Sequence, residues 1–335
     1  MVNVILGELT GKAKELYGEV EGPIKALLME RDEAWKHDEQ NVMDKIFKQE
    51  NSTHRIEGYG AMSEMDDWEP VGENGEHPAT TMEALPMKYI SNETWKKSFA
   101  ISREIIDDDV LNELRQRPMK FIAGYHRARQ NFFAQLLVAA MTNKASFKLK
   151  TFSFNAECYD GKKLFAQHDL LLAKGKNINA FSDAFSADAL IRATTAGQNF
   201  RDDNGNILNI DFDTIVIPND AALKKEVIGV LEAVRDTSVP GGNKGNGLLS
   251  GKFDVICTPL LNDAVTEGHT PWMLLDSRYN QNYNCLIAQN RVGLEVKSHV
   301  ADNDALVWNG YSRFGGGFVD YRAVACGGLS FGSAL

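Results

Sequence analysis

A long polar segment, residues 51–100, constrains the fold more than any other part of this 335-residue sequence. It carries Gly and Pro throughout and has no helical period. Between residues 56 and 87 it holds eight acidic residues and no Lys or Arg. Asn74-Gly75 is a pair typical of the turn that closes a two-stranded hairpin. A lone hairpin is marginal in water, so we expect an extended β-loop that reverses near Asn74 and finds partners elsewhere. The alternative is an unpartnered acidic surface loop.

The strongest helical signal, residues 103–143, follows this loop directly. Ser102 can cap it, and the acids at 104 and 107–109 lie where a helix N-terminus favours negative charge. Pro118 predicts a kink, or a break at which a second helix begins. Residues 111–144 carry six basic residues and one acidic residue. An acidic loop is therefore followed by a basic helix.

The rest of the chain predicts a mixture of helices and strands. Residues 1–50 form an acidic arm of helical stretches, broken at Gly22-Pro23, and its sparse apolar stripe favours packing on something else, such as a neighbouring subunit. After residue 145 we expect a strand at 147–154, a helix at 187–200, a turn at 202–206 and a strand at 213–217. A helix capped by Asn219 and a strand from 253 follow. The last forty residues read as strands, with glycines 315–317 at a turn or a tight backbone approach.

Composition excludes several classes of protein. The net charge of −10 argues against a main task of gripping nucleic acid through its phosphates. Hydrophobic residues at 43% and charged residues at 24% are typical of a folded protein. No uncharged apolar run is long enough to cross a membrane, and the first residues lack the pattern of a signal peptide.

Residues that carry catalytic chemistry do not form a recognisable set. The four cysteines (Cys158, Cys257, Cys285 and Cys326) contain no CxxC pair, which excludes a typical zinc site and favours buried, reduced thiols. His168-Asp169 favours a hydrogen bond to nearby backbone over catalysis. Residues 241–247 lack the phosphate-loop template, and residues 202–206 do not continue as a calcium loop. We therefore predict no catalytic residue, cofactor or metal, with a soluble α/β enzyme as a minor alternative.

Four stretches, in order, resemble the major capsid proteins of tailed phages with the Hong Kong 97-like fold, and most closely the Mu-like major head subunit family. They are WKKSFAISREIIDDDV at 95–110, DGKKLFAQH at 160–168, the strand before Pro218, and a set at 255–263, 271–274, 308–315 and 319–323. Their order over about residues 55–329 is more specific than any one of them. The N-terminal arm matches less well, so a separate scaffold protein or a processed form is expected.

The resemblance implies an α+β fold in five parts. These are an N-terminal arm (1–50), an extended E-loop (51–101), a peripheral domain with a long spine helix (102–180), an axial α/β domain (181–295) and return strands (296–335). It implies a major capsid protein, of a phage or prophage, that assembles with itself into hexamers and pentamers. These would tile an icosahedral shell around double-stranded DNA. Such a protein is made in the host bacterial cytoplasm and resides in the virion.

The resemblance also implies partners other than self. They are a scaffold, a portal, decoration proteins, and packaged DNA through weak, non-specific contact; no membrane is involved. An encapsulin-type compartment shell, which encloses cargo enzyme instead of DNA, is the alternative within the structural class. Some members of the wider fold join subunits by a Lys–Asn isopeptide bond. Lys88, Lys96 and Lys97 are candidate donors, although no matching Asn or acid can be identified by motif.

The charge pattern leads to a hypothesis of its own. We expect the acidic loop of one subunit to face the basic helix of another, guiding assembly by electrostatic complementarity. The alternative is that the basic helix faces packaged DNA. The residues predicted to form these surfaces are Glu64, Asp66, Asp67, Glu69, Glu73 and Glu76 on the loop, and Arg115, Arg117, Lys120, Arg127 and Arg129 on the helix.

Overall fold

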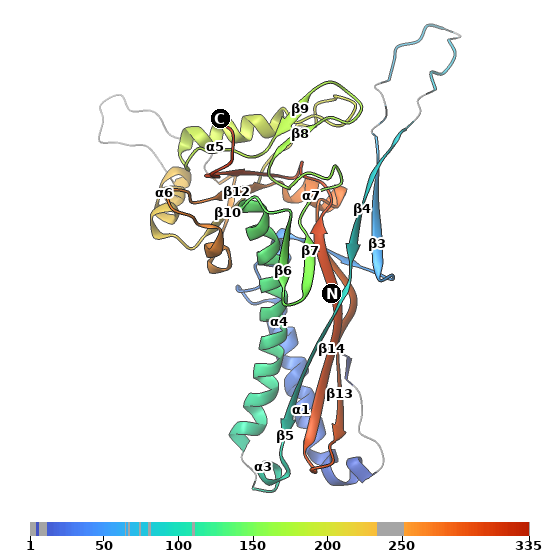
Figure 1. The fold of residues 1–335 in the computed structure, drawn as a ribbon, viewed down its shortest axis with the longest axis vertical. Coiled ribbons are helices and arrows are strands. Elements are labelled where there is room, and N and C mark those ends of the chain that lie inside the picture. Colours follow the sequence, from blue (N-terminus) through green and yellow to red (C-terminus); the bar gives the residue numbers. More distant parts are fainter. Residues whose placement is uncertain are drawn as a thin grey trace. The chain divides into compact units, whose positions relative to one another are not determined.

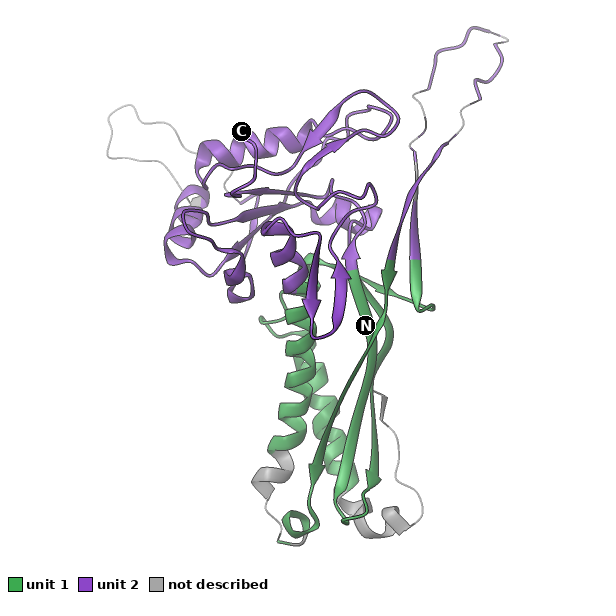
Figure 2. Ribbon diagram, viewed as in Figure 1, with its two compact units in different colours: residues 1–57, 90–133, 287–316 green, residues 58–89, 134–286, 317–335 purple. Residues whose placement is uncertain are grey.

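The structure is a computed structural model that describes residues 5–6, 12–63, 65, 68–73, 75–79, 82–108, 111–232 and 251–334. The chain forms two compact units, each assembled from three separate stretches (Figure 2). Unit 1 comprises residues 1–57, 90–133 and 287–316, and unit 2 comprises residues 58–89, 134–286 and 317–335. Each unit therefore joins segments that are distant in sequence, whereas the predicted parts are consecutive.

Unit 1 is organised around a five-stranded sheet in the order β1-β13-β14-β5, with β2 also paired to β13 (Figure 1). Its strands are β1 (Ile5–Leu6), β2 (Lys48–Asn51), β5 (Glu93–Ile101), β13 (Leu286–Val300) and β14 (Leu306–Phe318). β5 and β14 are antiparallel, whereas β1 and β2 both run parallel to β13. The helices are α1 (Lys12–Lys36), α2 (Met43–Ile46), α3 (Arg103–Asp107) and most of α4 (Leu111–Met141).

The N-terminal arm packs on its own unit. Ile24 and Leu28 of α1 are buried in one cluster with Ile122 of α4 and Trp308 of β14. The break predicted at Gly22-Pro23 is wrong, because α1 continues through Pro23. A proline inside a helix costs about 3 kcal/mol, whereas burying an Ile and a Leu side chain contributes roughly 1.5–3 kcal/mol each. Packing therefore outweighs the local preference.

The long basic helix begins later than its sequence pattern indicates. α3 ends at Asp107, and α4 begins at Leu111 and continues through Pro118 to Met141. Pro118 therefore neither ends a helix nor begins one, and the interruption lies upstream of it. Glycines 315 and 316 mark a tight approach: a Cβ on Gly316 would lie 2.5 Å from the Phe133 ring of α4. Of the two interpretations of residues 315–317, the close approach is correct.

Unit 2 contains a four-stranded sheet in the order β11-β10-β12-β15. Its strands are β10 (Thr214–Pro218), β11 (Asp254–Thr258), β12 (Trp272–Leu275) and β15 (Val324–Gly327). β10 and β11 are parallel, and β12 is antiparallel to β10 and to β15. The helices are α5 (Ala187–Gln198), α6 (Ala221–Glu232), the 3-10 turn η1 (Pro259–Ala264) and α7 (Ser277–Tyr283). The core between α5 and the sheet includes Leu190, Phe212 and Trp272.

Three two-stranded ribbons complete the fold. They are β3 (Ile56–Met62) with β4 (Ala84–Ser91), β6 (Ser146–Leu149) with β7 (Phe152–Asn155), and β8 (Gln167–Asp169) with β9 (Lys176–Ile178). The single strand predicted at 147–154 is wrong, because the chain reverses at Lys150, which adopts a left-handed backbone with φ of 55°. That conformation suits a two-residue hairpin turn but is uncommon for a residue with a long side chain.

Most local signals in unit 2 are confirmed. Ser186 caps α5 by accepting the Ala189 N–H, and Asp202 closes the turn at 202–206 by accepting the Asn206 N–H. The cap of α6 is Asp220, which accepts the Leu223 N–H, and not the predicted Asn219. All four cysteines are free; three are buried, but Cys257 is partly exposed, contrary to the prediction. Burial raises the pKa of the Cys158 and Cys285 thiols well above the ordinary value, which keeps them unreactive.

A buried cation holds the C-terminal part of unit 2. Arg322 donates to Asp203 at 2.6 Å, to Asp320 at 2.8 Å and to the Tyr159 hydroxyl at 2.9 Å. Burial alone would lower the pKa of Arg322, but the neighbouring Asp320 carboxylate and other groups raise it well above the ordinary value. The guanidinium therefore stays charged and neutralises acids that could not be buried without it.

We expect Arg322→Leu to destabilise the subunit by about 3–5 kcal/mol, because it leaves buried carboxylates without a partner. Arg192→Leu is the matched control: Arg192 is exposed and lies 3.6 Å from Asp183, and such a pair contributes about 0–1 kcal/mol. Chemical denaturation of the unassembled subunit measures both changes. Equal losses for the two variants would contradict the structural role of Arg322.

Candidate functional site

The acidic loop extends from a two-stranded ribbon. Among the described residues, β3 and β4 pair with each other and with no further strand, and residues 63–83 connect their ends (Figure 1). Ser63 and Glu83 close the ribbon, since the Ser63 N–H donates to the Glu83 carbonyl and the Glu83 N–H donates to the Ser63 hydroxyl. A hydrogen bond from the Gly75 N–H to the Gly72 carbonyl marks the reversal of the chain. The predicted extended loop is therefore present; Asn74 itself lies outside the described residues.

The loop presents acids and apolar side chains to solvent. Glu69, Glu73 and Glu76 are exposed, whereas Glu64, Asp66 and Asp67 lie outside the described residues. Trp68 is 100% exposed, and Met65 is 56% exposed. Among the described residues of 63–83, only Ser63 is buried. The described part of the loop thus exposes large apolar side chains as well as its acids.

The start of β3 is held by a cluster of polar groups in unit 1. The Glu57 carboxylate accepts hydrogen bonds from the His54 N–H, the Ser52 hydroxyl and the Thr53 N–H. These bonds lower the pKa of Glu57 to about 2. The buried Asn92 amide donates to Ser52 and to the His54 carbonyl. The carboxylate therefore remains ionised and acts as a fixed acceptor at the start of β3.

The basic helix retains fewer free cations than its sequence indicates. Arg129 is only 6% exposed; its guanidinium donates to Asn290 and to Gln49 and lies 3.7 Å from an Asp44 oxygen. Arg117 donates to the Ala100 carbonyl at 2.6 Å. These contacts lie within one chain, so both residues fasten α4 to its own unit.

Two of the predicted basic residues keep a surface position. Lys120 and Arg127 are exposed, and Lys120 donates to Gln116 of the same helix at 3.1 Å. The side chain of Arg115 lies outside the described part of the structure. The helical period distinguishes the buried cation from the exposed ones: Arg129 shares a face with the buried Ile122 and Phe133, whereas Arg127 is turned away from it.

The three candidate cross-linking lysines have different surroundings. Lys96 and Lys97 of β5 are exposed, and the Lys96 ammonium lies 5.7 Å from the centre of the Tyr311 ring. Lys88 of β4 is buried, and its amine donates to the Asn155 side chain and to the Glu157 carbonyl. The sequence pattern did not identify Lys88 as a structural residue. A signal was present, however, because residues two apart in a strand lie on the same face, and Ile90 on that face is buried.

The histidine of the DGKKLFAQH stretch is structural. His168 is completely buried, its Nδ1 lies 2.6 Å from an Asp160 oxygen, and its ring stacks on Tyr321 with centres 3.5 Å apart. Burial opposes ionisation of Asp160, but hydrogen bonds from His168 and from the Lys162 N–H lower its pKa overall. The sequence predicted a backbone partner for His168. Besides its contact with Asp160, the His168 ring has such a partner, because its Nε2 lies 3.3 Å from the Leu164 carbonyl oxygen.

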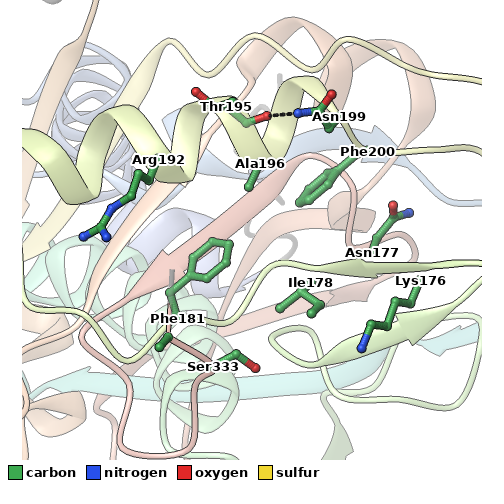
Figure 3. Close-up of a pocket in the computed structure, with 11 residues that line it drawn as sticks. Lys176, Asn177, Ile178, Phe181, Arg192, Thr195, Ala196, Asn199, Phe200 and Ser333 are labelled. Carbon is green, nitrogen blue, oxygen red and sulfur yellow. Dashed lines mark hydrogen bonds between the residues drawn. The ribbon is translucent and has the colours of Figure 1, made fainter.

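A groove of about 440 Å³ lies beside α5 in unit 2 (Figure 3). Its charged lining residues are Lys176 and Arg192, and Phe181 and Phe200 provide apolar walls. The Thr195 hydroxyl at its edge donates to the Ile191 carbonyl. The described residues that line the groove include no carboxylate, imidazole or thiol side chain.

The described residues contain no group of three or more His, Cys, Asp or Glu side chains placed to hold a metal ion. Within the same residues, no helix combines the length and the apolar character needed to cross a bilayer.

Comparisons with solved structures identify the fold. The capsid of Ralstonia phage GP4 superposes with a TM-score of 0.51 at 9% identity, covering 86% of this chain and 87% of that chain. The capsid of the native GTA particle gives 0.48 at 12% identity and coverages of 88% and 91%. The capsid of Myoviridae phage XM1 gives 0.48 at 11% identity and coverages of 86% and 89%. The predicted α+β phage-capsid fold is therefore confirmed.

Sequence comparison assigns the family. No curated protein gives a significant match. A family model described as phage capsid protein matches residues 88–327, well over half of the sequence. That match includes β5, α4, β10 and β12, and it agrees with the shared fold and with the expectation of a structural protein rather than an enzyme. The chain belongs to the phage capsid protein family.

Proposed function

We propose that this phage capsid protein builds its shell by assembling with itself into hexamers and pentamers that close an icosahedron around double-stranded DNA. The observation that carries the proposal is the family match over residues 88–327. The exposed acidic loop supports it, because the loop places the apolar side chains of Trp68 and Met65 in solvent, where a neighbouring copy could cover them. Rotationally related copies that each contact the next one form closed rings.

Membership of the Mu-like major head subunits is a finer proposal. It rests on the four sequence stretches, and the second of them has a compact structural basis. Asp160 accepts the Lys162 N–H at 3.0 Å, Gly161 adopts a φ of 73°, and His168 returns to Asp160. The spacing of this stretch is thus required to bring its first and last residues together.

The five parts that the family resemblance implies can be compared with the two units of the structure. We propose that unit 1, with most of α4 as the spine helix, corresponds to the peripheral domain within 102–180 together with the return strands 296–335. The four-stranded sheet with α5 and α6 corresponds to the axial domain, 181–295. The arm, 1–50, contributes α1 to unit 1, and the E-loop, 51–101, contains the β3–β4 ribbon and β5.

We propose that the acidic loop of one copy lies on a basic surface of the next. The exposed acids Glu69, Glu73 and Glu76 provide one side, and Lys120 and Arg127, the exposed members of the predicted helix surface among the described side chains, provide the other. Such attraction acts mainly on the rate and specificity of association. It is screened by salt, because the Debye length falls from about 10 Å at 0.1 M to about 3 Å at 1 M.

Other partners follow from the same function. A scaffold, a portal and decoration proteins are proposed as assembly partners. Contact with packaged DNA is proposed to be weak, because a subunit with a net charge of −10 repels phosphates on average.

We expect the purified chain to form closed shells, tubes or ring-shaped capsomers when it is concentrated. Negative-stain electron microscopy with light scattering measures this directly. Shells that contain nucleic acid support a phage head, whereas shells that contain a protein cargo favour the encapsulin-type alternative. A monomer or dimer under all salt conditions, with and without a co-expressed scaffold protein, would contradict self-assembly.

We expect the double variant Lys120→Glu/Arg127→Glu to lower the yield of shells several-fold at 0.1 M salt, with a smaller difference at 1 M salt. Both positions are exposed, so the subunit should keep its unfolding midpoint. Reversing Glu73 and Glu76 to Lys in the same chain should recover part of the yield. Unchanged shells at unchanged yield would sink the charge hypothesis.

Arg129→Glu is the contrasting variant. We expect it to destabilise the isolated subunit, because it places a carboxylate in a buried position near Asp44. Thermal unfolding of the unassembled subunit separates this effect from a loss of assembly. A stable Arg129→Glu subunit would contradict the buried role of Arg129.

A further inference from the structure

The β3–β4 ribbon needs an anchor that sets its direction. A two-stranded ribbon is marginal by itself, and β4 pairs with β3 only. Leu85, Lys88 and Ile90 are the buried residues of β4. Apolar contacts are non-directional, so the two aliphatic side chains hold the ribbon down without fixing its angle. Lys88 is the member of this set that forms hydrogen bonds to another element.

The surroundings of Lys88 form a defined socket in unit 2. Its amine donates to Asn155 Oδ1 at 2.9 Å and to the Glu157 carbonyl at 2.5 Å. Asn155 is oriented in turn, since its Oδ1 accepts the Glu157 N–H at 2.6 Å and its Nδ2 donates to Glu157 Oε2 at 3.2 Å. The side chain that receives the amine is therefore held at the end of β7 before Lys88 contacts it.

Because the Lys88 amine is buried, the stability of the ribbon depends on the acceptors that this amine finds. Desolvation lowers the pKa of the Lys88 amine. A buried amine without acceptors is costly, so an orientation of the ribbon that gives Lys88 both acceptors is favoured over one that removes them. Hydrogen bonds to a charged donor are about twice as strong as neutral ones and depend on angle. The Lys88 contact thus adds a directional restraint on β4 to the hydrogen bonds that Glu57 accepts at the start of β3.

The anchor also determines which face of the ribbon is available. With Lys88 and Ile90 turned inward, Met87 and Tyr89 are 50% and 62% exposed. A Cβ on Gly58 would lie 3.0 Å from the Met87 side chain and 3.1 Å from the Tyr89 ring, so glycine lets both side chains lie flat across β3. The exposed face of the ribbon at Met87 and Tyr89 is thus apolar, and it lies on the strand that directly follows the acidic loop.

We propose that Lys88 is a positioning residue for assembly: it locks the β3–β4 ribbon so that its Met87–Tyr89 face and the acidic loop are presented to a second copy of this chain. The inference rests on the proposed function for the identity of the partner. The socket itself is a property of the single chain. The two can therefore be tested separately.

The experiment compares Lys88→Met with Lys97→Met in the full chain. Lys97 is an exposed lysine of β5, so its variant controls for the loss of one positive charge. Amide hydrogen exchange of residues 84–91 is measured in the unassembled subunit, and shell yield is measured by electron microscopy. We expect Lys88→Met to raise exchange in this segment about tenfold and to lower shell yield, with β14 protected as in the wild type. Lys97→Met should change neither.

A second variant tests the socket from the other side. Asn155 is exposed, so Asn155→Leu removes one acceptor with little risk to the core, and it should raise exchange in the same segment. Wild-type exchange in both Lys88→Met and Asn155→Leu would overturn the anchor. Raised exchange with wild-type shell yield would overturn its role in assembly. Failure of the wild-type chain to assemble at all, with raised exchange in the variants, would refute the proposed function while retaining the anchor.

Discussion

The close approach of α4 to the sheet of unit 1 is the constraint on which that unit depends. Aromatic rings on the helix press against β14 where the strand has no side chain. A Cβ on Gly310 would lie 2.5 Å from Phe121, and one on Gly316 would lie 2.5 Å from Phe133. The strand β14 and the helix α4, which are distant in sequence, therefore share one apolar layer. Larger residues at these positions would separate helix from sheet and open the core.

Burial separates the basic residues that stabilise the fold from those that can contact another molecule. Arg129 and Arg322 are both enclosed by acceptors of their own chain, which makes them costly to remove and unable to contact a partner. Lys88 is an intermediate case, because its contacts are internal while the segment that it orients is external. Net charge summed along a sequence segment cannot separate these roles, since it counts enclosed and solvated charges equally.

The sequence predicted what depends on local chemistry. The acidic loop, its reversal near residue 74, the cap of α5 and the turn closed by Asp202 all follow from residue preferences over a few positions. The family resemblance supplied the fold, which composition and periodicity alone did not determine.

The errors have more than one physical cause. Pro23 lies within a helix because long-range packing outweighs a local penalty, and of the two alternatives at Pro118 the break is excluded because α4 continues through it. Arg127 and Arg129, treated as one surface, lie two positions apart on a helix and so face different directions. Lys150 reverses a segment whose alternation predicts one strand, since a two-residue turn needs a backbone that its side chain disfavours. Only the case of Pro23 depends on partners that are distant in the chain; the other two follow from the geometry of one helix and one hairpin.

The strand pairings of β13 and β14 affect the order in which parts of unit 1 can form during synthesis. Lys48 of β2 pairs with Ile287, and Glu93 of β5 pairs with Phe314, so both pairings join residues more than two hundred positions apart. Closing such long segments is slow compared with forming a helix. While a ribosome is still translating the middle of the chain, α1 and α4 have no sheet to pack on. The sheet on which α4 packs is completed only after β14 has emerged, so a subunit cannot join a shell before that point.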